Sequence, residues 1–198
     1  MVFVLDASSS ITEQDFQKEK TIVNTVTEYF GLSDATGRSA VVVYGDQATV
    51  EIGFHDFIAL DQFKEAITNI TQYKGSTRID RALFKTNEVL SPVFQTRESA
   101  RKLVFVLSDG EQSRASDVIA LDIASLPLNS KRAKVFAIGI GSDVNREQLR
   151  KIVKRDEDIL TAQNFYQLLD YVKLVSEQQC HGKGKEMAVL NGGEGYPH

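Results

Sequence analysis

Three short apolar runs constrain the fold more than any other feature of this 198-residue sequence. They lie at residues 2–5, 103–107 and 135–140, are rich in Val, Ile and Phe, and lack clean alternation of apolar and polar residues. Continuous runs of this kind are typical of strands that are buried on both faces of a parallel sheet. The sequence therefore predicts a sheet covered by helices on each side.

Stretches with helical spacing separate the apolar runs. The first predicted helix covers residues 13–30, follows Thr12 as its N-cap and ends at Gly31. Because proline lacks an amide hydrogen, Pro92 and Pro127 are expected to end two later helices. The remaining helices are predicted at residues 60–70, 79–90, 117–126, 145–153 and 165–179.

Two further strands complete the predicted sheet. Residues 40–44 and 48–54 flank a turn at Gly45-Asp46, so they predict a hairpin with one antiparallel edge strand. Residues 159–160 predict a last edge strand. The order of elements predicts a doubly wound, mostly parallel open α/β sheet with helices on both faces. Ligands bind such sheets outside the carboxyl ends of the strands, where the strand order reverses.

Composition and charge limit the class of protein. The 42% hydrophobic and 25% charged residues suit one globular domain, predicted at 1–180, and the glycine-rich residues 181–198 predict a flexible tail or linker. A net charge of −4 argues against a nucleic-acid-binding protein. No apolar run reaches the length of a membrane span, and no signal peptide precedes the first strand, which indicates a segment of a longer protein.

Polar side chains follow the predicted strands. Asp6, Ser8 and Ser10 come after the first strand, Asp109 follows the run at 103–107, and Thr77 opens a helix. These segments should meet at one edge of the sheet, because the carboxyl ends of parallel strands share an edge. Carboxylate and hydroxyl oxygens bind hard cations, and few carboxylates with several hydroxyls favour Mg²⁺ or Mn²⁺ over Ca²⁺. The five residues predict one divalent-cation site.

Each of these residues has a structural alternative. Asp and Ser are common N-caps, so the polar residues after the first strand could instead form a turn that caps the first helix. Asp109 could be only a turn residue before Gly110. Ser76 and Thr77 compete for the same role because both precede the helix. Ser76 is expected to be the helix cap, and the family resemblance given next favours Thr77 as the metal ligand. Four further residues either rim the site or belong to a solvated loop, and the sequence favours neither reading: Ser9, Glu111, Gln112 and Arg114.

The five residues together resemble the metal-ion-dependent adhesion site of von Willebrand factor A domains, the family of the integrin I domains. The resemblance extends from residue 2 to about residue 179. Within the family, the sequence most resembles the A domains of matrilins and non-fibrillar collagens. The matching segments are Asp6-x-Ser8-x-Ser10, Gly75-Ser76-Thr77, Ser108-Asp109-Gly110 and Ala137-Ile138-Gly139-Ile140-Gly141.

This resemblance implies an extracellular adhesion or matrix protein-binding module. The bound Mg²⁺ or Mn²⁺ would be completed by a carboxylate of the partner protein, and the final helix at 165–179 would move when the partner binds. The alternative is a structural matrix protein that binds collagen or self-associates through a metal-independent face. We expect no enzymatic activity, because no histidine belongs to the motif and no phosphate-binding loop is present.

Three further features qualify this expectation. The loop after Asp109 is predicted to be short, which leaves no room for the extra helix of collagen-binding integrin I domains. Cys180 is either an incidental thiol or half of a disulfide, and the resemblance implies a partner upstream of the first strand. Asn69-Ile70-Thr71 is a sequon for N-glycosylation.

Overall fold

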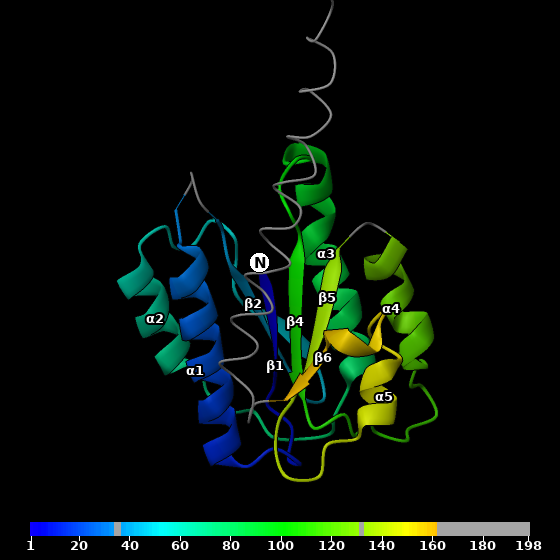
Figure 1. The fold of residues 1–198 in the computed structure, drawn as a ribbon. Helices are drawn as coiled ribbons and strands as arrows, with labels where there is room; N and C mark the ends of the chain where they lie inside the picture. The colour runs from blue at the N-terminus through cyan, green and yellow to red at the C-terminus, as the bar shows by residue number, and fades with distance from the viewer. Residues whose placement is uncertain (34–36, 131–132, 162–198) are drawn as a thin grey trace, which may run out of the picture. The chain divides into compact units, whose positions relative to one another are not determined.

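A six-stranded sheet with helices on both faces forms the described part of the chain (Figure 1). The computed structural model describes residues 1–33, 37–130 and 133–161. The strands are β1 Val2–Asp6, β2 Ala40–Tyr44, β3 Ala48–Ile52, β4 Leu103–Ser108, β5 Lys134–Gly139 and β6 Ile159–Thr161. The helices are α1 Glu13–Phe30, α2 Leu60–Asn69, α3 Ile79–Thr96, α4 Leu121–Ser130 and α5 Arg146–Arg150, with a short 3₁₀ helix, η1, at Asp156–Asp158.

The strand order is β3-β2-β1-β4-β5-β6, with β3 antiparallel to β2 and the other pairs parallel. The predicted doubly wound sheet with one antiparallel edge strand is thus confirmed, and β6 is the edge strand expected at the other side. The chain leaves β1 toward β2 and later returns to β4 on the opposite side of β1. The strand order therefore reverses between β1 and β4, which is where such sheets bind ligands.

Both faces of the sheet are buried. On one face the rings of Phe3, Phe105 and Phe136 stack across three neighbouring strands, with centroids 5.2 and 5.3 Å apart. The strand register causes this, because Phe3 pairs with Phe105 and Phe105 with Phe136. On the other face, Val2 and Val4 join the apolar side chains of α3, α4 and α5 in one core.

The first helix has the predicted bounds. Thr12 Oγ1 accepts a hydrogen bond from the Asp15 amide at 3.1 Å, as an N-cap does. The helix ends at Gly31, whose φ of 75° lies in the region that glycine adopts without a steric cost. Its buried face includes Phe16 and Val23, at helical spacing.

The predicted helix ends at Pro92 and Pro127 are wrong. The third helix continues through Pro92 to Thr96, and α4 contains Pro127. α4 also begins at Leu121 instead of residue 117. Residues before it are held outside the helix, since the Asp117 carboxylate binds Arg78.

Other differences are smaller. β3 ends at Ile52, two residues earlier than predicted, and a bulge lies between its pairs Val41–Ile52 and Val42–Val50 with β2. α5 is shorter than predicted, although it begins where the sequence predicted, with Asn145 as its N-cap. Residues 110–120 between β4 and α4 form a longer non-helical segment than expected. The predicted helix at 165–179, Cys180 and the boundary at 180 lie outside the described residues.

Candidate functional site

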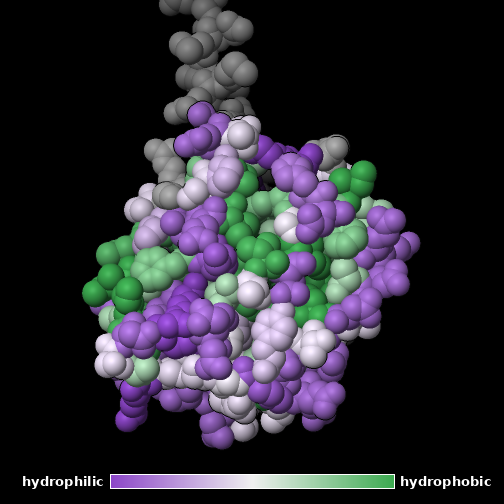
Figure 2. Space-filling model, turned by 180° about the vertical axis from the view of Figure 1, so that it is seen from behind, coloured by the Kyte–Doolittle hydropathy of each residue, from purple (hydrophilic) through white to green (hydrophobic). Residues whose placement is uncertain are grey.

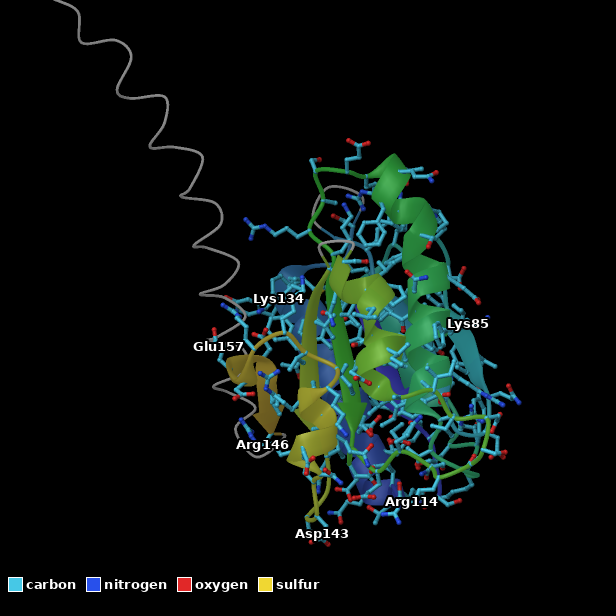
Figure 3. The ribbon with its side chains drawn as sticks, turned by 90° about the vertical axis from the view of Figure 1, so that its right-hand side faces the viewer. Lys85, Arg114, Lys134, Asp143, Arg146 and Glu157 are labelled. Carbon is cyan, nitrogen blue, oxygen red and sulfur yellow. The ribbon has the colours of Figure 1, made fainter. Side chains whose placement is uncertain are left out.

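The candidate site lies where the strand order reverses, at the carboxyl ends of β1 and β4. Asp6 is the last residue of β1 and Ser108 is the last residue of β4. Ser108 Oγ donates a hydrogen bond to Asp6 Oδ2 at 2.9 Å, so the two strand ends are in direct contact. Figure 3 shows this edge of the sheet at the bottom of the view, where Arg114 and Asp143 are labelled.

Three of the predicted ligands form a chain of hydroxyl groups. Ser8 Oγ lies 3.0 Å from Ser10 Oγ, and Ser10 Oγ lies 3.4 Å from Thr77 Oγ1. Ser8 and Thr77, at the two ends of this chain, are buried, while Ser10 in the middle is exposed. Ser76 instead donates to Asp46 Oδ1 at 2.5 Å. Of the two competing hydroxyls, Thr77 is the one that meets the serines.

Asp6 lies fully buried beneath these hydroxyls. Its Oδ1 accepts the Ser8 amide at 3.0 Å, and its Oδ2 accepts the Tyr44 hydroxyl at 2.8 Å as well as Ser108 Oγ. Burial raises the pKa of Asp6 to about 6; these hydrogen bonds oppose the rise, and the charge of Asp109 adds to it. The carboxylate is therefore fixed in orientation but costly to ionise without a nearby cation.

A second buried carboxyl group, Glu19 of α1, supports Asp6. Glu19 Oε2 accepts the Asp6 amide at 2.9 Å. Burial, followed by the charge of Asp6, raises the pKa of Glu19 well above its usual value, which favours the neutral form. Sequence reasoning missed Glu19 and Tyr44 because both lie far along the chain from Asp6. A charged residue on the buried face of a predicted helix was the one available signal for Glu19.

Asp109 approaches from the β4 side. Its Oδ1 accepts the Glu111 amide at 2.9 Å, and its carbonyl accepts the Asn145 amide at 2.7 Å. Its charge raises the pKa of Asp6, so the two carboxylates act on the same region. Behind it, Gly110 has a φ of 83°, and a Cβ there would lie 2.6 Å from the Asn145 carbonyl. The loop packs too closely against Asn145 to admit a side chain at Gly110.

The Ser8–Ser10 loop and the loop before Thr77 are bonded together by their backbones. The Lys74 amide donates to the Ala7 carbonyl at 2.7 Å, and the Ser9 amide donates to the Gly75 carbonyl at 2.9 Å. The Gly75 amide returns a bond to Ser9 Oγ at 2.9 Å. Gln72 adds side-chain bonds to the Ser8 and Ile11 carbonyls. The three hydroxyls are therefore held by a preformed pair of loops.

Residues 112–113 connect the Asp109 loop to Thr77. The Thr77 amide donates to Ser113 Oγ at 2.8 Å, and the Ser113 amide donates to the Thr77 carbonyl at 3.0 Å. Gln112 Oε1 accepts the Ile79 amide at 2.8 Å, so Gln112 caps α3 instead of lining the rim. The prediction that Ser76 caps this helix is wrong, because its hydroxyl is bonded to Asp46.

The chemistry of the site is that of hard oxygen donors. Among residues 1–33, 37–130 and 133–161, no three His, Cys, Asp or Glu side chains form a metal-binding cluster. A site of two carboxylates and three hydroxyls differs from such clusters, and its donors suit a small divalent cation. Within the same ranges no helix is long and apolar enough to cross a membrane.

The fold and this edge of the sheet define a doubly wound α/β domain with an oxygen-rich site at its switch point. The von Willebrand factor type A domain model matches residues 1–178, so the chain belongs to that family. The collagen alpha-5(VI) chain of Homo sapiens is 31% identical over 93% of this chain and 7% of its own length. Integrin alpha-M of Mus musculus is 30% identical over 76% of this chain and 13% of its own length. The chain thus spans a small part of these relatives.

A solved structure shares the fold. Proximal thread matrix protein 1 from the mussel byssus, with a zinc-occupied MIDAS motif, superposes with a TM-score of 0.75. It is 26% identical, over 86% of this chain and 43% of its own. The relatives are matrix and adhesion proteins, and they place this domain among extracellular modules of that kind.

Proposed function

We propose that this chain is an extracellular adhesion module that binds a protein ligand through one divalent cation, Mg²⁺ or Mn²⁺. Its ligands are the five predicted residues, Asp6, Ser8, Ser10, Thr77 and Asp109. The observation that carries the proposal is the chain of hydroxyls from Ser8 through Ser10 to Thr77. It joins segments 67 positions apart and begins at Ser8, whose amide is bonded to Asp6.

The residues present fit such a cation. A buried carboxylate that is oriented by three hydrogen bonds, yet costly to ionise, is stabilised by a positive charge beside it. Neutral hydroxyl donors leave a bound cation electrophilic, so it can attract a carboxylate of the partner protein. The chain's part is to hold these oxygens in place and to expose Ser10 to the partner. None of the five proposed ligands is a histidine that could act as a base, which supports a binding role over catalysis.

Calorimetry with the metal-stripped chain tests the ion site. We expect one Mn²⁺ or Mg²⁺ per chain, with binding abolished by Asp109→Asn and weakened by Thr77→Val. The matched control is Asp143→Asn, which removes the same charge from an exposed residue of the same edge and should bind as the wild type does (Figure 3). Equal affinity of the wild type and Asp109→Asn would refute the assigned ligands.

A second measurement tests the ligand-bridging role. Immobilised collagen is the first probe, because collagen chains are among the relatives. Binding that requires Mg²⁺, is lost in EDTA and is lost in Asp109→Asn supports the proposal. Collagen binding that persists in EDTA and in Asp109→Asn would show that the partner binds a metal-independent face instead.

One observation favours such a face as the alternative. Ile119, just before α4, and Ile123 and Leu126, three positions apart on α4, are 39%, 56% and 60% exposed. In the rear view of Figure 2, apolar surface is visible at the left margin, the side on which α4 lies. Ile123→Glu should then reduce collagen binding that persists in EDTA, and should leave ion binding unchanged.

A further inference from the structure

Thr77, one of the proposed ligands, is followed by a buried arginine. Arg78 is 6% exposed, and its guanidinium donates through Nε and Nη2 to the two carboxylate oxygens of Asp80, each at 2.9 Å. Nη1 donates to Asp117 Oδ2 at 2.9 Å, and Nη2 also reaches the Asp117 carbonyl at 3.2 Å. A planar guanidinium satisfies this arrangement, whereas a lysine ammonium cannot bind both partners in the same geometry.

One partner of Arg78, Asp117, belongs to the segment that follows Asp109. Asp117 lies near the end of this segment, and the Ile119 amide donates to Asp80 Oδ2 at 3.1 Å. Arg81 strengthens the connection, since it binds Asp117 Oδ2 at 2.9 Å and the Asp46 carbonyl at 2.7 Å. The arginines thus join the start of α3 to residues 117–119.

The other end of the segment is bonded to the same place. Ser113 exchanges two hydrogen bonds with the backbone of Thr77, and Gln112 caps the Ile79 amide. Residues 112–119 are therefore fixed to the N-terminus of α3 at both ends. Thr77 lies on one side of this attachment and Asp109 on the other.

We propose that Arg78 is a positioning residue, which sets the relative placement of Thr77 and Asp109 and hence the affinity for the cation. The inference rests on the proposed function for its metal readout. Arg78 touches neither the hydroxyl chain nor Asp6, so it acts through the segment 112–119. Residues that support metal ligands in this way contribute about 10- to 100-fold to metal affinity.

The test compares Arg78→Lys with Lys134→Met in the full chain. Lys134 binds the buried Asp158 at 2.5 and 2.6 Å at the amino end of β5, the opposite edge of the sheet from the candidate site. Lys134→Met loses its ion pair with the buried Asp158, and Arg78→Lys loses part of the hydrogen bonding to Asp80 and Asp117, so both should melt at a lower temperature. At a temperature at which both variants are folded, Arg78→Lys should bind Mn²⁺ at least about tenfold more weakly than the wild type. Lys134→Met should bind Mn²⁺ as the wild type does.

Amide hydrogen exchange gives a readout that needs no metal. The Thr77, Ile79 and Ser113 amides form the hydrogen bonds between residues 112–113 and the start of α3. They should exchange faster in Arg78→Lys and at the wild-type rate in Lys134→Met. If the wild type binds no Mn²⁺, the proposed function fails while the exchange still decides whether Arg78 orders the segment. Unchanged exchange at these three amides would overturn the inference, as would a wild-type Mn²⁺ affinity of Arg78→Lys.

A separate observation carries a second inference, about modification. The sequon residues Asn69 and Thr71 are both exposed, and Asn69 is the last residue of α2. Ile70 between them has extended backbone angles, φ −62° and ψ 128°, so the sequon leaves the helix at the acceptor residue. The chain then reaches Gln72, which binds the carbonyls of the Ser8 loop.

We infer that Asn69 carries an N-linked glycan when the chain passes through a secretory pathway. The glycan would cover the α2 side of the metal edge and direct a partner toward the side of residues 110–120. Secretion of the full chain from animal cells, with a signal peptide added, tests this. The intact mass should fall on treatment with peptide N-glycosidase, Thr71→Ala should lack the glycan, and Thr71→Ser should keep it. A wild-type chain that is secreted without a glycan would overturn the inference.

Discussion

At the scale of single residues, the central feature is a carboxylate that the fold orients and buries at once. Asp6 receives three hydrogen bonds, yet its pKa is raised to about 6 because burial outweighs them. A folded-state pKa above the unfolded value means that the ionised group destabilises the metal-free fold. The cost appears as the pH rises from about 3.8 toward 6 and reaches about 3 kcal/mol at neutral pH.

Asp6→Asn should therefore stabilise the metal-free chain while removing its response to Mg²⁺. At pH 7 in EDTA we expect the variant to melt above the wild type, by an amount equivalent to about 1 to 3 kcal/mol. The difference should shrink at pH 4, where Asp6 is protonated in the wild type. Thermal melts at both pH values check this, and a variant that melts lower at pH 7 would contradict it.

How far the sequence predicted the site depends on the kind of residue. The Ser8, Ser10 and Thr77 hydroxyls could be placed at one edge, because each follows a strand or opens a helix. The groups that orient Asp6 could not, because the apolar pattern of its strand explains Tyr44 equally well, and a charged residue on the buried face of a helix does not say which group Glu19 contacts. Their roles depend on which strands become neighbours, and local spacing does not encode that.

At the scale of elements, the start of α3 is held by charges instead of by a local cap. Burial alone would raise the pKa of Asp80, but the hydrogen bonds from Arg78 and the Ile119 amide outweigh it and lower the pKa to about 2. A folded-state pKa below the unfolded value contributes stability above about pH 3.8. This contribution, about 2 kcal/mol, should be lost as the pH falls from 3.8 toward 2.

Asp80→Asn should accordingly lower stability at pH 6 and have little effect near pH 2. Urea denaturation of both proteins across this range measures the difference. An effect that is the same at pH 2 and pH 6 would show that the ion pair with Arg78 is not its cause.

Pro92 offers a second test at this scale. It is exposed within α3, removes one backbone hydrogen bond and crowds the preceding turn. Pro92→Ala should stabilise the chain by about 1 to 2 kcal/mol, since the helix gain exceeds the entropy that proline removes from the unfolded chain. Chemical denaturation checks this, with Ser91→Ala as a neighbouring control. A loss of stability would mean that α3 depends on a bend at Pro92.

Helix prediction failed at the same two prolines for a related reason. Local rules end a helix where an amide hydrogen is missing. In α3, however, Leu90 is buried just before Pro92, and in α4 Leu128 is buried just after Pro127. Leu121, Ala124 and Leu128 of α4 form one buried face that spans Pro127. Packing against the sheet stabilises that helix more than the missing bond destabilises it. By contrast, α1 has Thr12 and Gly31 at its ends, and there the local signals and the packing agree.

At the scale of the whole molecule, the fold was the most predictable feature. Runs such as Val41–Val43 and Val104–Leu107 are buried on both sides, as strands in the middle of a sheet are. The antiparallel edge followed from the turn at Gly45-Asp46. The bulge in β3 did not, because it depends on the partner strand.

The reversal of strand order between β1 and β4 has a consequence for folding kinetics. Asp6 and Ser108 are 102 positions apart, and they meet only when β1 and β4 pair. Long-range parallel pairing forms slowly, because a large loop must close, at a cost in entropy, before the stabilising contacts form. A cation site at this junction should be incomplete until the last stages of folding. Saturating Mg²⁺ should then slow unfolding and leave the refolding rate nearly unchanged, which the two arms of a denaturant chevron would separate.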